Sequence, residues 1–202
     1  MLAGLMLGLA ELGPLSSLMM QHLLVMNVIA PLASLVLAPR LDAEADRAGV
    51  LWAAGGAQIL VLWGWHAPAL QRLAAGSAGV HLAFLALLGA AAILFWAVLL
   101  RAGAQGRWGA IAALLLTGKL ACLLGGLLIF APRELYGLAS LAVSICRTGP
   151  ATLADQQLAG LLMIAACPLS YVVAGVVMAA QMLVSLERRP AAVDVRLWGA
   201  AS

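Results

Sequence analysis

The side chains best suited to chemistry stand in the segment SLMMQHLLVMNVIAP, residues 17–31. His22 lies there between Met19 and Met26, and the rest of the segment is almost wholly apolar. On a helix that turns by about 100° per residue, these three side chains fall within an arc of about 60°. Imidazole and thioether groups suit copper, and thioether sulfur favours Cu(I). The pattern indicates a soft-metal site, with ordinary packing of methionines in a membrane helix as the alternative.

The composition that surrounds this segment is that of a membrane protein. Of the 202 residues, 65% are hydrophobic and 9% charged, whereas soluble domains carry about 25% charged residues. A spanning helix needs about 20 apolar residues, and five segments meet this need: 15–38, 49–67, 78–101, 108–131 and 156–186. A shorter apolar element, 2–13, precedes Pro14, and the run 136–146 is a candidate interfacial helix. We therefore predict an all-α, polytopic transmembrane helical bundle of five to six spans, with one domain over residues 1–190 and a tail at 191–202.

The distribution of arginine predicts how the bundle is oriented. Cytoplasmic loops of membrane proteins carry an excess of Lys and Arg. One side of the predicted bundle holds seven of these residues: Arg40, Arg47, Arg101, Arg107, Arg188, Arg189 and Arg196. The other side holds three, namely Arg72, Arg133 and Arg147. The count places the C-terminal tail in the cytoplasm and leaves Lys119 near the middle of its span, where it pairs with Asp155 or Glu11 or extends toward the surface.

All three histidines of the chain fall on the extracytoplasmic side of this topology. His22 lies about two turns inside its span, His66 ends the next span, and His81 begins the one after. Polar residues in or near a span are candidates for function, although a water-facing histidine at an interface is also ordinary. The predicted metal ligands are His22, His66, His81, Met19 and Met26. The predicted supporting residues, at the start of the last span, are Asp155, Gln156 and Met163.

Two other functions remain open at this stage. Two histidines at equal depth on facing helices are able to supply both axial ligands of a haem, which would make the chain an electron-transfer subunit. A copper permease would use the same entry site, but a cation such as Lys119 at the midplane opposes the passage of metal ions. No arrangement of Ser, His and carboxylate suggests catalysis, so we expect no enzyme. The net charge of +3 gives no indication of a nucleic-acid partner.

Five motifs follow one another between residues 17 and 163: MMQHLLVMNVIAPLASLVLAP, WHAP, ILFW, FAPRELY and ADQQLAGLLM. In their order and spacing, the chain resembles the CtaG-type cytochrome c oxidase assembly factors, a multi-spanning bacterial family. By position, the residues that match the family's polar motif residues are His22, His66, His81, Asp155, Gln156 and Met163. The chain departs from the family pattern where a second histidine often follows the one at 81, since Leu85 stands there.

The resemblance implies a function and a setting. It implies a multi-pass protein of the bacterial inner membrane that assists the maturation of haem–copper oxidase and handles copper for its metal centres. The partners that it implies are cytochrome c oxidase subunits or a periplasmic copper chaperone, with membrane lipid around the bundle. We expect copper, as Cu(I), to be the metal.

Overall fold

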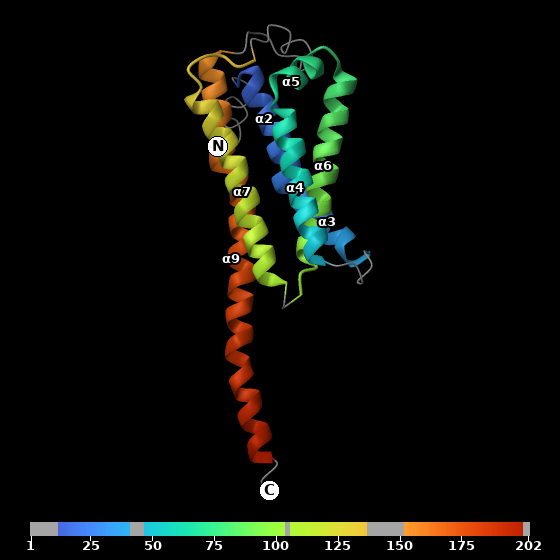
Figure 1. Ribbon diagram of the computed structural model, residues 1–202, viewed down its shortest axis with the longest axis vertical. Helices are drawn as coiled ribbons and strands as arrows, with labels where there is room; N and C mark the ends of the chain where they lie inside the picture. Colours follow the sequence, from blue (N-terminus) through green and yellow to red (C-terminus); the bar gives the residue numbers. More distant parts are fainter. Residues whose placement is uncertain (1–11, 41–46, 104–105, 137–151, 200–202) are drawn as a thin grey trace, which may run out of the picture.

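The computed structural model describes residues 12–40, 47–103, 106–136 and 152–199, and every regular element in these ranges is helical (Figure 1). In chain order, the elements are α2 (Pro14–Leu24), η1 (Val25–Ile29), α3 (Ala30–Leu37), η2 (Ala38–Arg40), α4 (Arg47–Trp65), α5 (Pro68–Ala75), α6 (Ala78–Leu100), α7 (Arg107–Phe130) and α9 (Leu153–Gly199). The predicted element 2–13 and all but the first residue of the predicted interfacial helix 136–146 lie outside the described residues.

Four helical segments are long and apolar enough to cross a membrane: Pro14–Arg40, Ala78–Leu100, Arg107–Phe130 and Leu153–Glu187. The apolar part of α4, Gly49–Trp65, is slightly shorter. The predicted polytopic helical bundle is therefore confirmed. One connection differs from the prediction, because residues 68–75 form α5 and not a loop. Proline at the first turn of a helix has its φ already set and needs no N–H partner there, which explains why α5 begins at Pro68.

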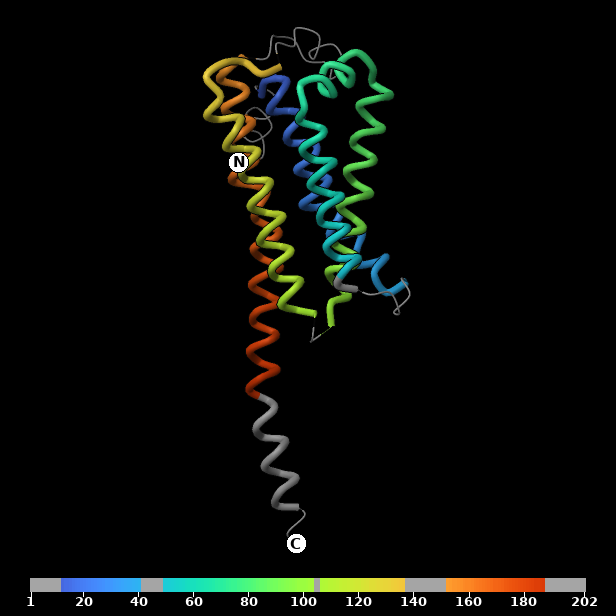
Figure 2. Tube along the Cα trace, in the orientation of Figure 1, coloured from blue at the N-terminus to red at the C-terminus, as the bar shows by residue number. Residues whose placement is uncertain are grey.

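Successive long helices run in opposite directions, so their ends gather at two ends of the bundle (Figures 1 and 2). The start of α2, the end of α4, α5, the start of α6, the end of α7 and the start of α9 meet at one end, which we call the histidine end. The opposite end, which we call the arginine end, carries Arg40, Arg101 and Arg107. The three histidines thus share one end of the bundle.

The first span contains a wide turn that the sequence pattern does not predict. Val25–Ile29 forms a π-helix between α2 and α3. Pro31 follows, and a proline inside a helix lacks an N–H and clashes with the carbonyl four residues earlier, here that of Asn27. A π turn is one way to relieve this clash, and such turns are frequent at functional sites. The turn shifts the phase of the side chains after Leu24, Met26 among them.

Among the described elements, α7 and α9 form the most extensive helix–helix contact, and they meet through two glycines. A Cβ placed on Gly125 would lie 2.9 Å from the Gly160 carbonyl, and one on Gly160 would lie 2.7 Å from the Gly125 carbonyl. Small residues allow this close backbone approach in membrane helices. The adjacent Gly126 makes no such contact, because nothing lies within 4 Å of a Cβ placed on it.

These two adjacent glycines form a matched pair for a test of packing. We expect Gly125→Ala to lower the free energy of unfolding by about 1–3 kcal/mol, since the methyl group forces α7 and α9 apart. Gly126→Ala adds the same methyl to open space and removes a flexible residue from a helix, so it should be neutral or stabilising by up to about 1 kcal/mol. Reversible unfolding in mixed micelles measures both. Equal effects of the two substitutions would contradict the glycine contact.

Candidate metal site at the histidine end

His66 stands in the turn directly after α4, and its ring is fixed by contacts on both sides. The nitrogen Nδ1 lies 2.7 Å from the Leu62 carbonyl oxygen, one turn earlier in the chain. The nitrogen Nε2 lies 3.2 Å from the thioether sulfur of Met19 in α2. Tyr136, which follows α7, donates its hydroxyl to the His66 backbone carbonyl at 3.1 Å. Contacts with α2 and α4 thus fix the imidazole of His66, and Tyr136 holds its backbone.

These contacts determine which nitrogen of His66 carries the proton. A carbonyl oxygen only accepts, so Nδ1 donates to Leu62 and carries the hydrogen. A neutral ring, the form that an apolar enclosure favours, then has a bare lone pair on Nε2. The Met19 sulfur has lone pairs and no hydrogen. Two electron-pair donors thus face each other across 3.2 Å, an arrangement that a soft cation between or beside them would stabilise.

His22 completes the group from the same helix as Met19. Its side chain is only 1% exposed, and its ring meets that of His66 edge to face, with centroids 5.2 Å apart. Neither ring nitrogen has a hydrogen-bond partner among the described residues. The Leu18 carbonyl, one turn earlier, is close enough for a weak backbone contact with the ring, but its geometry is not that of a formed hydrogen bond. Buried polar groups are nearly always hydrogen-bonded. The His22 ring therefore either binds a ligand or lowers the stability of the fold.

Other buried polar atoms at this end of the bundle also lack a partner within the described ranges. They are the Ser17 hydroxyl, the Trp65 indole nitrogen and the Gln71 amide nitrogen. Met19 is fully buried beside them. Burial also raises the pKa of the Tyr136 hydroxyl, so this group remains a hydrogen-bond donor to His66 at any physiological pH. The histidine end therefore combines buried polar groups that lack partners with a tyrosine that holds the backbone of His66.

His81, the third predicted histidine ligand, points elsewhere. Its Nε2 lies 3.0 Å from the side-chain oxygen of Gln21, and its ring packs on Trp65 with centroids 5.2 Å apart. The structure therefore brings His22, His66 and Met19 together and gives His81 a separate partner. Met26, also a predicted ligand, is buried in the π turn. Its backbone carbonyl accepts a hydrogen bond from the Trp96 indole at 3.3 Å.

Asp155, a predicted supporting residue, holds the start of α2. Its carboxylate accepts hydrogen bonds from the backbone N–H groups of Leu15, at 2.8 Å, and Ser16, at 3.1 Å. The Ser16 hydroxyl donates to the same carboxylate at 2.6 Å. The N-cap residue of α2, Gly13, provides no side-chain cap, so a residue of α9 serves instead. A carboxylate at a helix N-terminus is stabilised by the unpaired N–H groups and by the helix dipole.

Gln156 and Met163, the other two supporting residues, join α7 to α9. The Gln156 amide accepts from the Leu135 N–H at 2.9 Å and donates to the Leu128 carbonyl at 3.2 Å. It therefore satisfies backbone groups near the end of α7. Met163 is fully buried, and its Cβ lies 3.1 Å from a Cβ placed on Gly125. Both residues fix the packing of helices beside the histidine cluster.

The donor set of the cluster suits a soft metal. It consists of two imidazoles and one thioether, all buried. Within the described ranges, no group of three or more His, Cys, Asp or Glu side chains is arranged to hold a metal ion. Hard cations such as Mg²⁺ and Ca²⁺ take oxygen ligands, and the carboxylate of Asp155 is already engaged by α2. Sulfur together with imidazole is a set that copper accepts.

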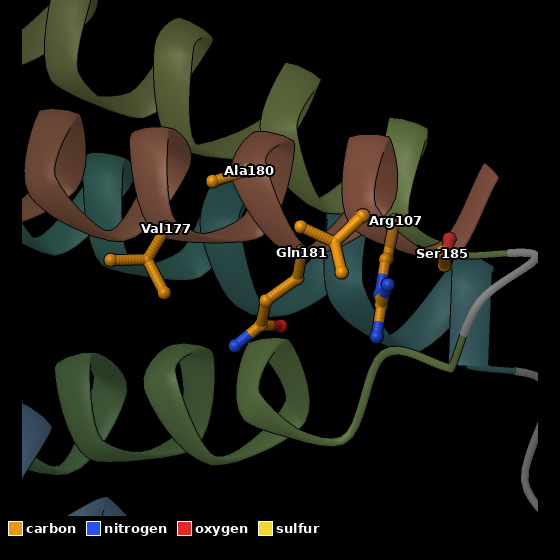
Figure 3. Close-up of a pocket in the computed structure, with 6 residues that line it drawn as sticks. Arg107, Val177, Ala180, Gln181 and Ser185 are labelled. Carbon is orange, nitrogen blue, oxygen red and sulfur yellow. The ribbon is translucent and has the colours of Figure 1, made fainter. Parts of the chain in front are cut away.

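A hollow lies at the arginine end, far from the histidines. It has a volume of about 480 Å³ and is lined by Arg107, Val177, Ala180, Gln181, Val184 and Ser185. Figure 3 shows these side chains along α9 and at the start of α7. None of them is a histidine, cysteine or methionine, so this hollow offers no ligand for a soft metal.

The fold defines the class of the protein as a polytopic helical membrane protein, with a buried histidine–methionine cluster at one end. Comparison with protein families adds its identity at the level of a family. The profile of the cytochrome c oxidase caa3 assembly factors (Caa3_CtaG) matches residues 51–185, which is more than half of the chain. The chain therefore belongs to this family. Searches of curated proteins and of solved structures returned no match.

The matched residues cover part of the cluster only. His66 and His81 lie within them, as do Asp155, Gln156 and Met163. His22, Met19 and Met26 precede residue 51, so their grouping with His66 rests on the geometry of this chain. The sequence pattern did not identify Tyr136 as a supporting residue of the site. It stands in the FAPRELY motif, but only the structure gives it a contact with the His66 backbone.

Proposed function

We propose that this assembly factor binds one Cu(I) between His22, His66 and Met19 and delivers it during the assembly of cytochrome c oxidase. The observation that carries the proposal is that electron-pair donors lie close together with no hydrogen atom between them. The His66 Nε2 faces the Met19 sulfur at 3.2 Å, and both nitrogens of the adjoining His22 ring lack hydrogen-bond partners in the part of the chain that the structure describes. Met26, which is buried on the same span, is the candidate further donor. The role is one of binding and transfer, without catalytic turnover.

The charge of the metal agrees with the surroundings. Imidazole and thioether are neutral ligands that need no deprotonation near neutral pH. A monovalent cation placed among them brings a single positive charge into a buried site, and charge burial is costly. Cu(I) is both soft and monovalent, so it matches the donors and the low polarity together.

The setting of the site follows from the distribution of charge. The histidine end is expected to face the periplasm and the arginine end the cytoplasm, because seven Lys or Arg residues were counted on the arginine side and three on the other. The C-terminus then lies in the cytoplasm of a bacterial cell, and the chain resides in the inner membrane. Copper would arrive from a periplasmic chaperone and leave to a subunit of the oxidase on the same side.

The haem alternative fits the geometry less well. Two histidines that ligate one haem iron stand on opposite faces of the macrocycle. The rings of His22 and His66 meet edge to face with centroids only 5.2 Å apart, which leaves no room for a macrocycle between them. The third histidine, His81, is engaged with Gln21.

Metal titration and an optical spectrum of the purified protein test the proposal. Under reducing conditions, we expect one Cu(I) to bind per chain in competition with a chromophoric Cu(I) chelator. We expect no Soret band in the protein as isolated, because haem is absent from this mechanism. A Soret band at one haem per chain, or failure to compete for Cu(I) in a folded sample, would reject the copper site.

A further inference from the structure

The charge of Lys119 lies in the middle of a span, on the outside of the bundle. Lys119 stands twelve residues after the first residue of α7 and eleven before the last. Its Cα is therefore about 18 Å and about 16 Å from the two ends of the helix. The side chain is exposed. The argument that Lys119 blocks a copper path through the bundle interior is thus wrong for this fold.

The surroundings of Lys119 on α7 are wholly apolar. Leu115, Leu116, Leu123 and Leu127 share the outer face of the helix and are each about half exposed. With Lys119 they make up what we call the Lys119 face. The four-carbon stem of a lysine covers less than half of the distance to either end of α7. The ammonium group therefore stays in hydrocarbon if lipid alone covers this face, and such a charge is costly there.

The described part of the chain offers no carboxylate at the depth of Lys119. Among the side chains that the structure describes, the acidic ones are Glu134 beyond the end of α7, Asp155 near the start of α9, and Glu187 at the end of the apolar part of α9. Asp155, which was predicted as a possible partner, is engaged by Leu15 and Ser16. Glu11, the other predicted partner, lies outside the described residues. A second copy of the chain would bring these same carboxylates, and none of those that the structure describes lies near the midplane.

We propose that the Lys119 face docks a transmembrane helix of a different protein, and that this helix carries an Asp or Glu near its midpoint. The leucines supply the packing surface, and the ion pair supplies register and specificity. Ionisable side chains inside a membrane are typically paired with one another, and an ammonium–carboxylate hydrogen bond is of the strong, charge-assisted kind. This inference does not depend on the binding of copper at the histidine end.

The test uses the full-length protein in lipid vesicles with designed helices as probes. One probe is a 20-residue Leu/Ala helix with a central Glu, and its control carries Gln at the same position. Association is measured by energy transfer between dyes on the protein and the probe. We expect the Glu helix to bind at least tenfold more tightly than the Gln helix. Lys119→Leu should abolish that difference, and Lys119→Arg should retain it.

Controls separate docking from a structural role of the lysine. Leu123→Ala, on the same face, should weaken both probes equally and leave the preference for Glu. Lys119→Leu should unfold at the same or a higher temperature than the parent in vesicles without probe, since it removes an unpaired charge. Equal binding of the two probes would overturn the proposal. So would thermal destabilisation of Lys119→Leu that Glu11→Gln reproduces, because Lys119 would then be paired with Glu11 within the chain. Self-association of the protein through the Lys119 face would overturn it as well.

Discussion

Replacement of His22 by leucine is expected to abolish Cu(I) binding and to leave the metal-free protein at least as stable as before. Loss of an outer-shell partner of a metal ligand already costs about 10–100-fold in affinity, so loss of the ligand itself should exceed about 100-fold. The stability effect has the opposite sign to that of most core substitutions. Both ring nitrogens of His22 are buried without a hydrogen-bond partner from the described segments, and such a group costs about 1–3 kcal/mol. Leucine removes that cost and fills a similar volume.

Measurements with and without copper separate the two effects. The free energy of unfolding of metal-free His22→Leu should equal or exceed that of the parent. The parent should gain about 2.7 kcal/mol at a free Cu(I) concentration 100 times its dissociation constant, and the variant should gain nothing. His81→Leu is the matched control, because His81 is a histidine at the same end that faces Gln21. It should retain copper affinity within about threefold, since no ligand is lost.

The same two variants give a second test in living cells. Cells that carry His22→Leu should assemble less active oxidase, and added copper should restore part of the activity because mass action replaces delivery. Cells with His81→Leu should resemble the parent. If His81→Leu loses copper and His22→Leu does not, the metal lies on the Gln21 side of α2 and the proposed ligand set is wrong.

The sequence was sufficient to place the histidines at one end of the bundle, because hydropathy fixes the spans and their alternation fixes the ends. Helical periodicity also put Met19 and His22 on one face of α2. It could not decide which histidine joins them. That choice depends on the ring orientation of His66, which is set by the Leu62 carbonyl and by the position of the backbone held by Tyr136. The second of these contacts links residues 70 positions apart, and no local pattern encodes it.

The sequence predicts how deep a residue lies in a span more easily than the side of the helix on which it lies. Counting residues placed Lys119 near the midplane, and α7 confirms that depth. The side of the helix on which Lys119 lies follows from the crossing of α7 with α9, which depends on Gly125 and Gly160. The π turn at Val25–Ile29 was also unpredicted, since the pattern of apolar residues around Pro31 is that of an ordinary span. Local sequence thus predicts the elements, and packing decides what their side chains face.

Asp155 illustrates the same limit and leads to the second large expected effect. Its place beside the histidines in the predicted topology indicated support of a metal site, whereas its carboxylate accepts three hydrogen bonds from Leu15 and Ser16 at the start of α2. Replacement by alanine leaves the two buried N–H groups without an acceptor. Hydrogen bonds to a charged group contribute about 1.5–3 kcal/mol each, and they share one carboxylate here. We expect Asp155→Ala to lower the free energy of unfolding by about 3 kcal/mol.

A series of substitutions distinguishes capping from a role at the metal. Asp155→Asn keeps one acceptor oxygen, so it should cost less than alanine. Ser16→Ala removes only the hydroxyl and should cost about 1 kcal/mol. Unfolding in mixed micelles measures these differences, and Cu(I) competition on the folded fraction measures the affinity. We expect the affinity of folded Asp155→Asn to stay within about threefold of the parent, because none of the proposed ligands is bonded to this carboxylate. A variant that unfolds like the parent but binds Cu(I) much more weakly would instead assign Asp155 to the metal site, and α2 would then need another cap.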